Sequence, residues 1–368
     1  MSTLDKKWLE EIWAKIDHKI SRTAVTCREM LPYTTDNGKW KERNVDWWTN
    51  GFWPGMMWLM YDATGNEEYR KTAERAEVLL DEALKHVTTL QHDVGFMWQI
   101  SAGANYRLTG NKDAFVRNMY AANMLAGRYN IKGGYIRAWN SENAKGWAII
   151  DCMMNIPLLY WASREIGDDR FKYIAMSHAD KTMKYHVRED GSVNHINEYN
   201  PENGDLVKVY AGQGYAEDSS WSRGQSWALY GFTLSYMHTK EKRYLDTAKK
   251  VANYFISAVC SDWLPRCDFR SPAEPVVYDT SAGLIAACGL IELSKCLGEN
   301  EGAMYFDAAV NLVKAISDKF ADWSDDTDAI IGYGTERYGN GEHIDMVYTD
   351  FYFVEAVNKL MGFDTFLW

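Results

Sequence analysis

Apolar residues recur at helical spacing along most of the chain, and short polar turns separate the apolar stretches. One turn pattern repeats at intervals of roughly 45 to 75 residues, a range typical of repeat architectures. Each copy has a small or polar residue, an acidic residue, an aromatic residue and then an Ala-rich stretch; the copies begin at Thr64, Thr109, Ile166, Thr239 and Leu297. A Gly that ends one helix, followed by polar residues that begin the next, is typical of a helical hairpin. Five such turns, with unmatched helices expected at 4–30 and 345–360, predict six hairpins.

Six hairpins can stack as a linear solenoid or close into a ring. Polar and aromatic clusters recur at the ends opposite the turns, and in a ring these clusters would converge on one mouth. We therefore predict an all-α fold, a six-hairpin (α/α)6 barrel in which residues 1–368 form a single domain. Strand patterns are few: VVY at 276–278 and short loop segments. No apolar run approaches the roughly 20 residues of a membrane helix, so we expect no membrane partner.

Charge and cysteine usage exclude several classes of protein. The 40 Lys and Arg residues against 51 Asp and Glu residues give a net charge of -11, with no cationic run of the kind that binds nucleic acid. The six cysteines are scattered without a CxxC pair, which argues against a zinc ribbon or a disulfide framework. The first residues carry no apolar core and no cleavage site typical of a secretory signal, so we expect reduced thiols in a cytoplasmic protein. The sequence makes no prediction of oligomeric state.

Aromatic residues are abundant, at 14% of the chain, and many stand beside polar residues. The segments 46–55 (DWWTNGFWPG), 137–140 (RAWN) and 219–227 (SSWSRGQSW) mix rings with polar side chains. Rings can stack on the C–H groups of a sugar while polar groups take its hydroxyls; the alternative for any one Trp is helix packing. Together the three clusters favour a ligand cleft that binds carbohydrate.

Two aspartates interrupt apolar stretches and are candidates for acid–base chemistry. Asp93 stands between His92 and the run VGFMW, where burial would raise the pKa of its carboxyl and cationic neighbours would lower it. Its alternative role is a helix N-cap. Asp151 and Asn155 are spaced i, i+4, which predicts a shared helix face that meets either the pore or a structural network. Pro157 either kinks that helix or marks its first turn.

A cation and a histidine complete the candidates derived from the residues. Arg223 lies between Trp221 and Trp227, which suits a carboxylate held by guanidinium between rings; the alternative is cation–π packing. His195 lies in a polar, turn-like segment where it could also be merely solvated. No HxxxH, HExxH or EF-hand pattern occurs, and neither GxxxxGK[ST] nor GxGxxG is present, so we expect no metal and no nucleotide cofactor.

Six segments together resemble the unsaturated glucuronyl hydrolases of glycoside hydrolase family 88. These segments are WTNGFWPG, QHDVGF, IIDCMMNIPLLYWA, NPENG, SWSRGQSWALYGF and DTSAGLIAACGL, in order from about residue 44 to 290. The resemblance implies a metal-free α/α barrel that acts downstream of polysaccharide lyases, which leave a C4=C5 double bond on the terminal uronate. Hydration of this enol ether gives an unstable hemiketal, which opens and releases the aglycone. The implied partner is an unsaturated oligosaccharide, of glycosaminoglycan type.

The resemblance also implies roles for individual residues. Asp151 would be the general acid/base, and Asp93 would hold sugar hydroxyls and tune Asp151. The uronate subsite would consist of His195, Gln213, Trp221, Arg223 and Trp227. The rings that stack on the sugars would be Trp48, Phe52 and Trp139, and His92, next to Asp93, would also bind substrate.

The chain departs from the family pattern in two places. It reads AGQG around Gln213, where the family often has His before the Gln, and the family Tyr of the C-terminal stretch has three alternative counterparts, Tyr333, Glu336 and Tyr338. That region lies on the aglycone side in relatives, so the departures concern substrate preference. Two other functions stay open at this point: an unsaturated rhamnogalacturonyl hydrolase on the same barrel, and a non-catalytic barrel that binds oligosaccharides.

Overall fold

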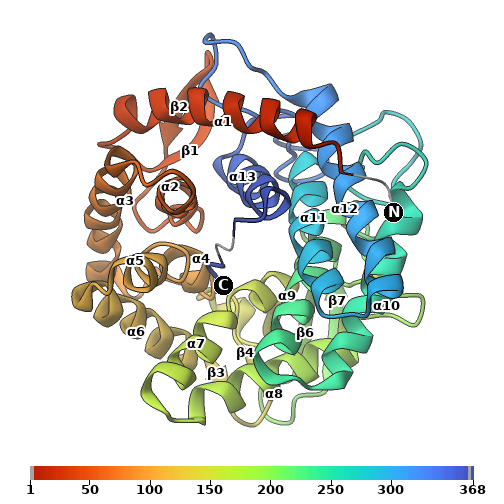
Figure 1. Cartoon of the computed structure of the whole chain (residues 1–368). Helices are drawn as coiled ribbons and strands as arrows, with labels where there is room; N and C mark the ends of the chain where they lie inside the picture. Colours follow the sequence, from red (N-terminus) through yellow and green to blue (C-terminus); the bar gives the residue numbers. More distant parts are fainter. Residues whose placement is uncertain (1–3, 364–365) are drawn as a thin grey trace.

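The computed structural model describes residues 4–363 and 366–368, and their helices form a closed double ring (Figure 1). Within these residues six helices form the inner ring: α2 (Phe52–Thr64), α5 (Ala102–Thr109), α7 (Pro157–Ile166), α9 (Ser222–Thr239), α11 (Thr280–Lys295) and α13 (Val347–Met361). Six form the outer ring: α1 (Lys6–Thr26), α3 (Glu67–Leu80), α6 (Lys112–Gly127), α8 (Arg170–Tyr185), α10 (Lys242–Val259) and α12 (Glu299–Phe320). The predicted all-α barrel is confirmed.

The burial of each ring follows from its sequence. Every residue of α11 up to Leu293 is buried, as expected for a helix that is apolar or small on all sides. In α10 the buried residues recur every three or four positions, from Tyr244 through Ala248 and Val251 to Phe255, so only one face meets the inner ring. The inner helices therefore enclose the core, and the outer helices shield it from water.

The predicted turns connect inner to outer helices. Gly65, Gly110 and Gly167 end α2, α5 and α7 in the left-handed conformation, which costs Gly little. Asn66 then caps α3 by accepting from the backbone N–H of Glu68. In the fourth turn Lys240 takes the left-handed conformation instead, with φ of 60°.

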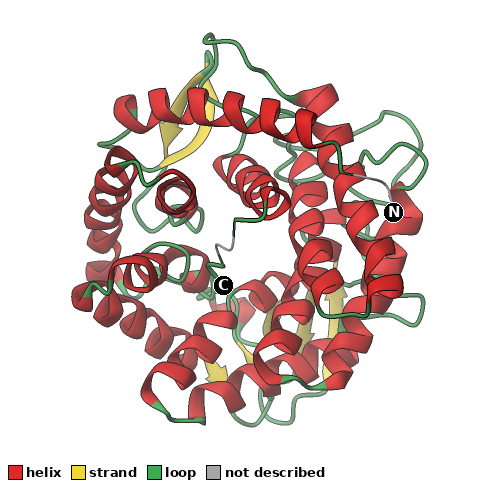
Figure 2. Ribbon diagram, in the orientation of Figure 1, coloured by secondary structure: helices red, strands yellow, loops and turns green. Residues whose placement is uncertain are grey.

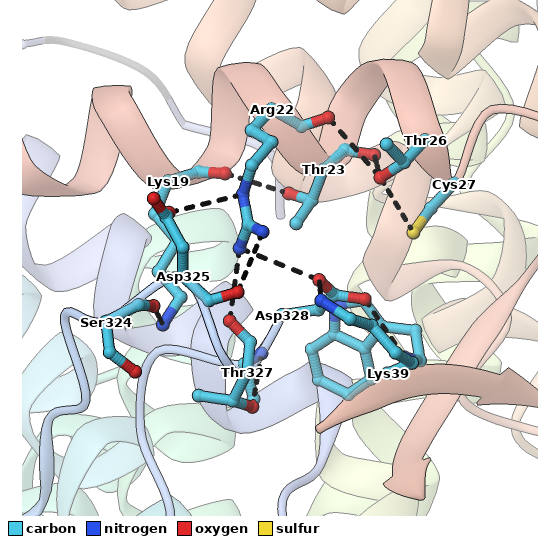
Figure 3. A network of polar contacts seen from close by, with 12 residues as sticks. Lys19, Arg22, Thr23, Thr26, Cys27, Lys39, Ser324, Asp325, Thr327 and Asp328 are labelled. Carbon is cyan, nitrogen blue, oxygen red and sulfur yellow. Dashed lines mark hydrogen bonds and ion pairs between the residues drawn. The ribbon is translucent and has the colours of Figure 1, made fainter. Parts of the chain in front are cut away.

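The ring closes where α1 packs on α13, a pair that no hairpin turn connects. Polar contacts join α1 to the loop after α12 (Figure 3). The Arg22 guanidinium donates to the Thr327 carbonyl at 3.1 Å, and Asp328 accepts from the Lys39 ammonium at 3.0 Å and from the Trp40 backbone N–H at 3.2 Å. We call this junction the seam of the ring.

Short strands lie in the connections that run from an outer to an inner helix, at the end opposite the hairpin turns (Figure 2). They pair antiparallel: β1 (Pro32–Asp36) with β2 (Lys39–Glu42), β3 (Tyr129–Asn130) with β4 (Tyr135–Ile136), and β6 (Ile196–Tyr199) with both β5 (Trp147–Ile149) and β7 (Leu206–Tyr210). The strand expected at 276–278 is wrong: this segment forms an isolated bridge between Arg266 and Tyr278. Within the described residues no helix is long and apolar enough to cross a membrane.

Candidate active site

A cavity of about 370 Å³ opens among the outer-to-inner connections. Its wall takes residues from widely separated segments of the chain: Tyr33, Asp46, Trp47, Trp48, Thr89, Gln91, His92, Asp93, Met97, Trp139, Ile149, Asp151, His195, Gln213, Arg223, Glu336, Arg337, Asn340 and Tyr348. Eight of the predicted site residues belong to this set: Trp48, His92, Asp93, Trp139, Asp151, His195, Gln213 and Arg223. The fold therefore brings the two candidate carboxylates into one pocket.

Asp151 lies in a short 3₁₀ segment, η3 (Ile150–Met154), between β5 and α7. The expected helix shared by Asp151 and Asn155 is wrong, because η3 ends before α7 begins at Pro157, whose missing N–H suits a first helical turn. Asn155 is instead a structural bridge. Its side chain donates to the Asp151 carbonyl at 3.2 Å and accepts from the Phe96 backbone N–H at 2.8 Å.

Asp93 occupies the N-cap position of α4 (Val94–Trp98), but its side chain makes no capping hydrogen bond. The carboxyl faces the pocket, where Asp93 Oδ2 lies 3.5 Å from His92 Nε2. Gly95 lets α4 approach the Asp151 segment, since a Cβ at this position would lie 2.5 Å from the Asn155 Cα. Asn155 and Gly95 therefore fix the separation of the two aspartates.

The pocket shifts the pKa values of Asp93 and Asp151 in opposite directions. Burial, with repulsion from Asp151, raises the pKa of Asp93 to about 8. Burial also acts on Asp151, but the nearby His195 and the Arg223 guanidinium outweigh it and lower the pKa of Asp151. At neutral pH the pocket therefore holds a protonated carboxyl and an ionised one.

His195 orients the ionised carboxylate. Its Nε2 lies 3.6 Å from Asp151 Oδ2, and its ring packs 4.2 Å from the Trp221 ring. Its Nδ1 accepts from the Gln213 backbone N–H at 2.9 Å and lies 3.2 Å from the Ala211 carbonyl; the shorter contact leaves the ring proton on Nε2, toward Asp151. Gly212 is required here, because its φ is +61° and a Cβ would lie 2.1 Å from His195 Nδ1.

Arg223 is fully buried and pairs with Asp279, a partner that the sequence did not indicate. Its guanidinium also donates to the carbonyls of Thr335 at 2.6 Å and Glu336 at 2.8 Å, and lies 4.6 Å from the centre of the Trp221 ring. Gln213 donates to the same Glu336 carbonyl at 2.5 Å. The cation–π contact considered for Arg223 is thus present, and the same guanidinium holds the 335–337 loop against the pocket.

Three expected substrate-binding rings lie beneath the wall of the pocket. Phe52 and Trp227 are completely buried and both pack on Phe96, at 5.4 and 5.1 Å between ring centres. Trp221 is buried under His195. These rings support the wall and do not line it.

The pocket also contains residues that sequence reasoning missed. Asp46 and Trp47 stand next to Trp48 in the first aromatic cluster, and Tyr348 precedes the aromatic run of α13, so the local sequence held a signal for them. The sequence around Tyr33 in β1 held no such signal. Of the three counterparts of the family Tyr, Glu336 lines the pocket, whereas Tyr333 and Tyr338 do not. Within the described part of the chain no group of three metal-ligating side chains occurs.

A carboxylic acid and a carboxylate in one aromatic pocket of an α/α barrel are suited to acid–base catalysis, the chemistry of carbohydrate-active enzymes. Residues 16–263 match glycosyl hydrolase family 88. The chain belongs to this family and is a glycoside hydrolase, as the sequence predicted.

Individual relatives are similar over most of their length. The unsaturated glucuronyl hydrolase of Bacillus sp. (strain GL1) is 37% identical over 328 residues, which cover 86% of each chain. The unsaturated chondroitin disaccharide hydrolase of Streptococcus pneumoniae is 33% identical over 335 residues, 89% of this chain and 84% of the relative. The crystal structure of the Bacillus sp. GL1 enzyme superposes with a TM-score of 0.92 at 32% identity and covers 96% of each chain. A structure of a UGL variant with dGlcA-Glc-Rha-Glc has a TM-score of 0.90, 32% identity and the same coverage.

Proposed function

We propose that this enzyme removes the terminal 4,5-unsaturated uronate from lyase-generated oligosaccharides by hydrating the C4=C5 enol ether. The observation that carries the proposal is the pair of pocket carboxyls, Asp93 and Asp151, whose pKa values move in opposite directions. Addition of water to an enol ether needs one proton for C4 and one base to take a proton from the water that attacks C5. A pair that holds one proton at neutral pH meets both needs.

The reaction assigns a role to each carboxyl. Asp93 passes the proton of the pair to Asp151, which gives it to C4 as the C4=C5 double bond becomes a single bond; water adds its oxygen to C5, and the proton lost by that water returns to Asp151. The hemiketal then opens and releases the aglycone. Since the two carboxyls interact, their proton belongs to the pair, and Asp93 is the reserve that supplies it while holding sugar hydroxyls. His195 keeps the Asp151 carboxylate oriented between turnovers.

The remaining predicted residues take binding roles in this proposal. Arg223, Gln213 and His195 form the uronate subsite, with Trp221 and Trp227 as its packed support. Trp48 and Trp139 stack on the sugar rings from the pocket wall, while His92 adjoins Asp93 and Phe52 supports Trp48 at 6.0 Å. We favour a hexosamine aglycone, as in glycosaminoglycan products, because the relatives include unsaturated chondroitin disaccharide hydrolases.

The test uses the absorbance of the substrate itself, since the enol ether is conjugated with its carboxylate and hydration destroys the chromophore. Purified protein is mixed with unsaturated disaccharides from chondroitin, hyaluronan and heparin, without added metal. We expect the ultraviolet absorbance to fall as free hexosamine appears, and Asp151→Asn to abolish the change. Full activity of folded Asp151→Asn would contradict the mechanism. Turnover of rhamnogalacturonan products alone would favour the rhamnogalacturonyl alternative, and binding without turnover of either would favour a carbohydrate-binding barrel.

The compartment and the domain organisation belong to the same proposal. We assign the enzyme to the cytoplasm, where lyase products of imported polysaccharide would reach it, and treat residues 1–368 as one catalytic domain. All six cysteines lie within the described residues and each is a free thiol, which suits a reducing compartment.

A further inference from the structure

One face of the β5–β6–β7 sheet continues outward from the pocket. Ile149, Ile196 and Tyr210 pair across the three strands, and Ile149 also lines the pocket. Two residues farther along the strands, Trp147, Glu198 and Lys208 form the next row. Because alternate residues of a strand point to one face, both rows share that face.

Three rings connect this face with the pocket wall. Trp139, which lines the pocket, has its ring centre 5.5 Å from that of Trp147, and Trp147 lies 4.7 Å from Tyr210. All three side chains are half-buried, so each still exposes part of its surface. Trp147 and Tyr210 do not line the pocket, and none of the roles assigned above uses them.

Polar groups surround the rings on the same face. The Tyr210 hydroxyl donates to Glu198 Oε2 at 2.5 Å. The Lys208 ammonium lies 4.7 Å from the centre of the Tyr210 ring and 3.3 Å from Glu217. Ring surface next to a carboxylate and an ammonium group suits a sugar that presents C–H groups, hydroxyls and a negative charge.

We propose that this face, defined by Trp147, Glu198, Lys208 and Tyr210, is a further substrate subsite outside the pocket. It binds the sugar residues that follow the aglycone in a tetrasaccharide or longer substrate, with an acidic sugar next to Lys208. Continuity with the pocket points to this occupant, because Trp139 and Ile149 line the pocket that holds Asp151 and adjoin Trp147 and Tyr210 on this face. This inference rests on the proposed function and extends it from the bond that is processed to the length of the substrate.

The experiment compares a disaccharide and a tetrasaccharide from the same lyase, both ending in the unsaturated uronate. A stacking contact contributes about 0.5–1.5 kcal/mol, so we expect Trp147→Ala and Tyr210→Ala each to lower kcat/KM for the tetrasaccharide about 2- to 12-fold, mostly through KM. Turnover of the disaccharide should stay unchanged, which also reports that each variant folds. Trp147→Leu keeps the bulk of the side chain without a ring and should behave like Trp147→Ala. It replaces Trp147→Ala in the test if that variant does not fold.

Matched variants separate this surface from others. Tyr210→Phe keeps the ring and should retain most of the tetrasaccharide activity, whereas Tyr120→Ala, at a 59% exposed position on α6, should change neither substrate. Equal effects of Trp147→Ala on both substrates, or no effect of either Trp147→Ala or Tyr210→Ala on the tetrasaccharide, would overturn the subsite. If the parent enzyme turned over neither substrate, the proposed function itself would be overturned.

Discussion

Replacing Asp93 by Asn should stabilise the protein while it removes activity. In the folded protein the pKa of Asp93 rises from the ordinary value of 3.8 to about 8. Between these values the folded state binds a proton that the unfolded state has lost, so the free energy of unfolding falls as pH rises through this range. Between pH 3.8 and pH 7 this loss in the free energy of unfolding amounts to about 4 kcal/mol, because each pH unit between the two pKa values corresponds to about 1.4 kcal/mol. The side chain is 16% exposed, so this figure is an upper limit.

An Asn side chain is neutral in both states and avoids this cost. We expect Asp93→Asn to raise the free energy of unfolding by about 2–4 kcal/mol at pH 7 and to change it little near pH 4, close to the ordinary pKa of 3.8, where the folded parent is protonated and its unfolded state has lost the proton only in part. Urea denaturation of parent and variant at the two pH values measures the difference. Activity on the disaccharide should fall by about 10²- to 10⁴-fold.

Asp151→Asn is the matched control with the opposite sign. Its carboxyl has a lowered pKa, which contributes stability above the ordinary pKa that is lost as pH falls, so this variant should be less stable than the parent at pH 7. The reasoning would be refuted if Asp93→Asn gave the same stability change at both pH values, or no gain at pH 7.

Four further variants probe the fold around the pocket and the turns. Gly95→Ala should lower Tm and kcat together, at a cost of about 1–3 kcal/mol, because the new methyl group would force α4 away from Asn155; parent-like kcat would contradict this account of the spacing. Lys240→Gly should raise the free energy of unfolding by about 1 kcal/mol in a urea titration, since it relieves a left-handed residue, and Gly167→Ala should show the opposite sign. Burial lowers the pKa of His238 to about 3, so the parent pays for keeping this ring neutral as pH falls below 6.5. His238→Phe should therefore gain about 2 kcal/mol relative to the parent between pH 7 and pH 5, and a constant difference across that range would contradict it.

The inner-to-outer turns could be predicted because their signals are local. At Gly65 and Asn66, for example, a Gly with a left-handed φ is followed directly by an Asn that caps the next helix. The number and order of these hairpin turns along the chain then predicted the barrel. The outer-to-inner connections resisted prediction, because their strands are as short as two residues and are held by partners distant in the chain. The pairing Trp147 with Glu198 has no counterpart in local propensity.

In the site, too, features with a local sequence signal could be predicted, and contacts between distant segments could not. Asp93 and Asp151 could be found because an acidic residue in an apolar stretch is conspicuous in the sequence. The partner of Arg223 could not, because Asp279 lies 56 residues away and meets it only in the folded core. The expected helix at Asp151 failed for a local reason: Pro157 begins α7, and the preceding residues form a tighter 3₁₀ turn.

The seam sets the order in which this molecule becomes active. Hairpins form between neighbours in the chain, but the seam joins residues as far apart as Arg22 and Thr327, separated by 305 positions. Closing a loop of that length costs about 5 kcal/mol of chain entropy, so ring closure is expected to follow hairpin formation. Tyr33 and Tyr348 come from opposite sides of this seam and line the same pocket. The complete pocket therefore forms only when the ring closes. The rate at which activity appears during refolding should then report the rate of ring closure.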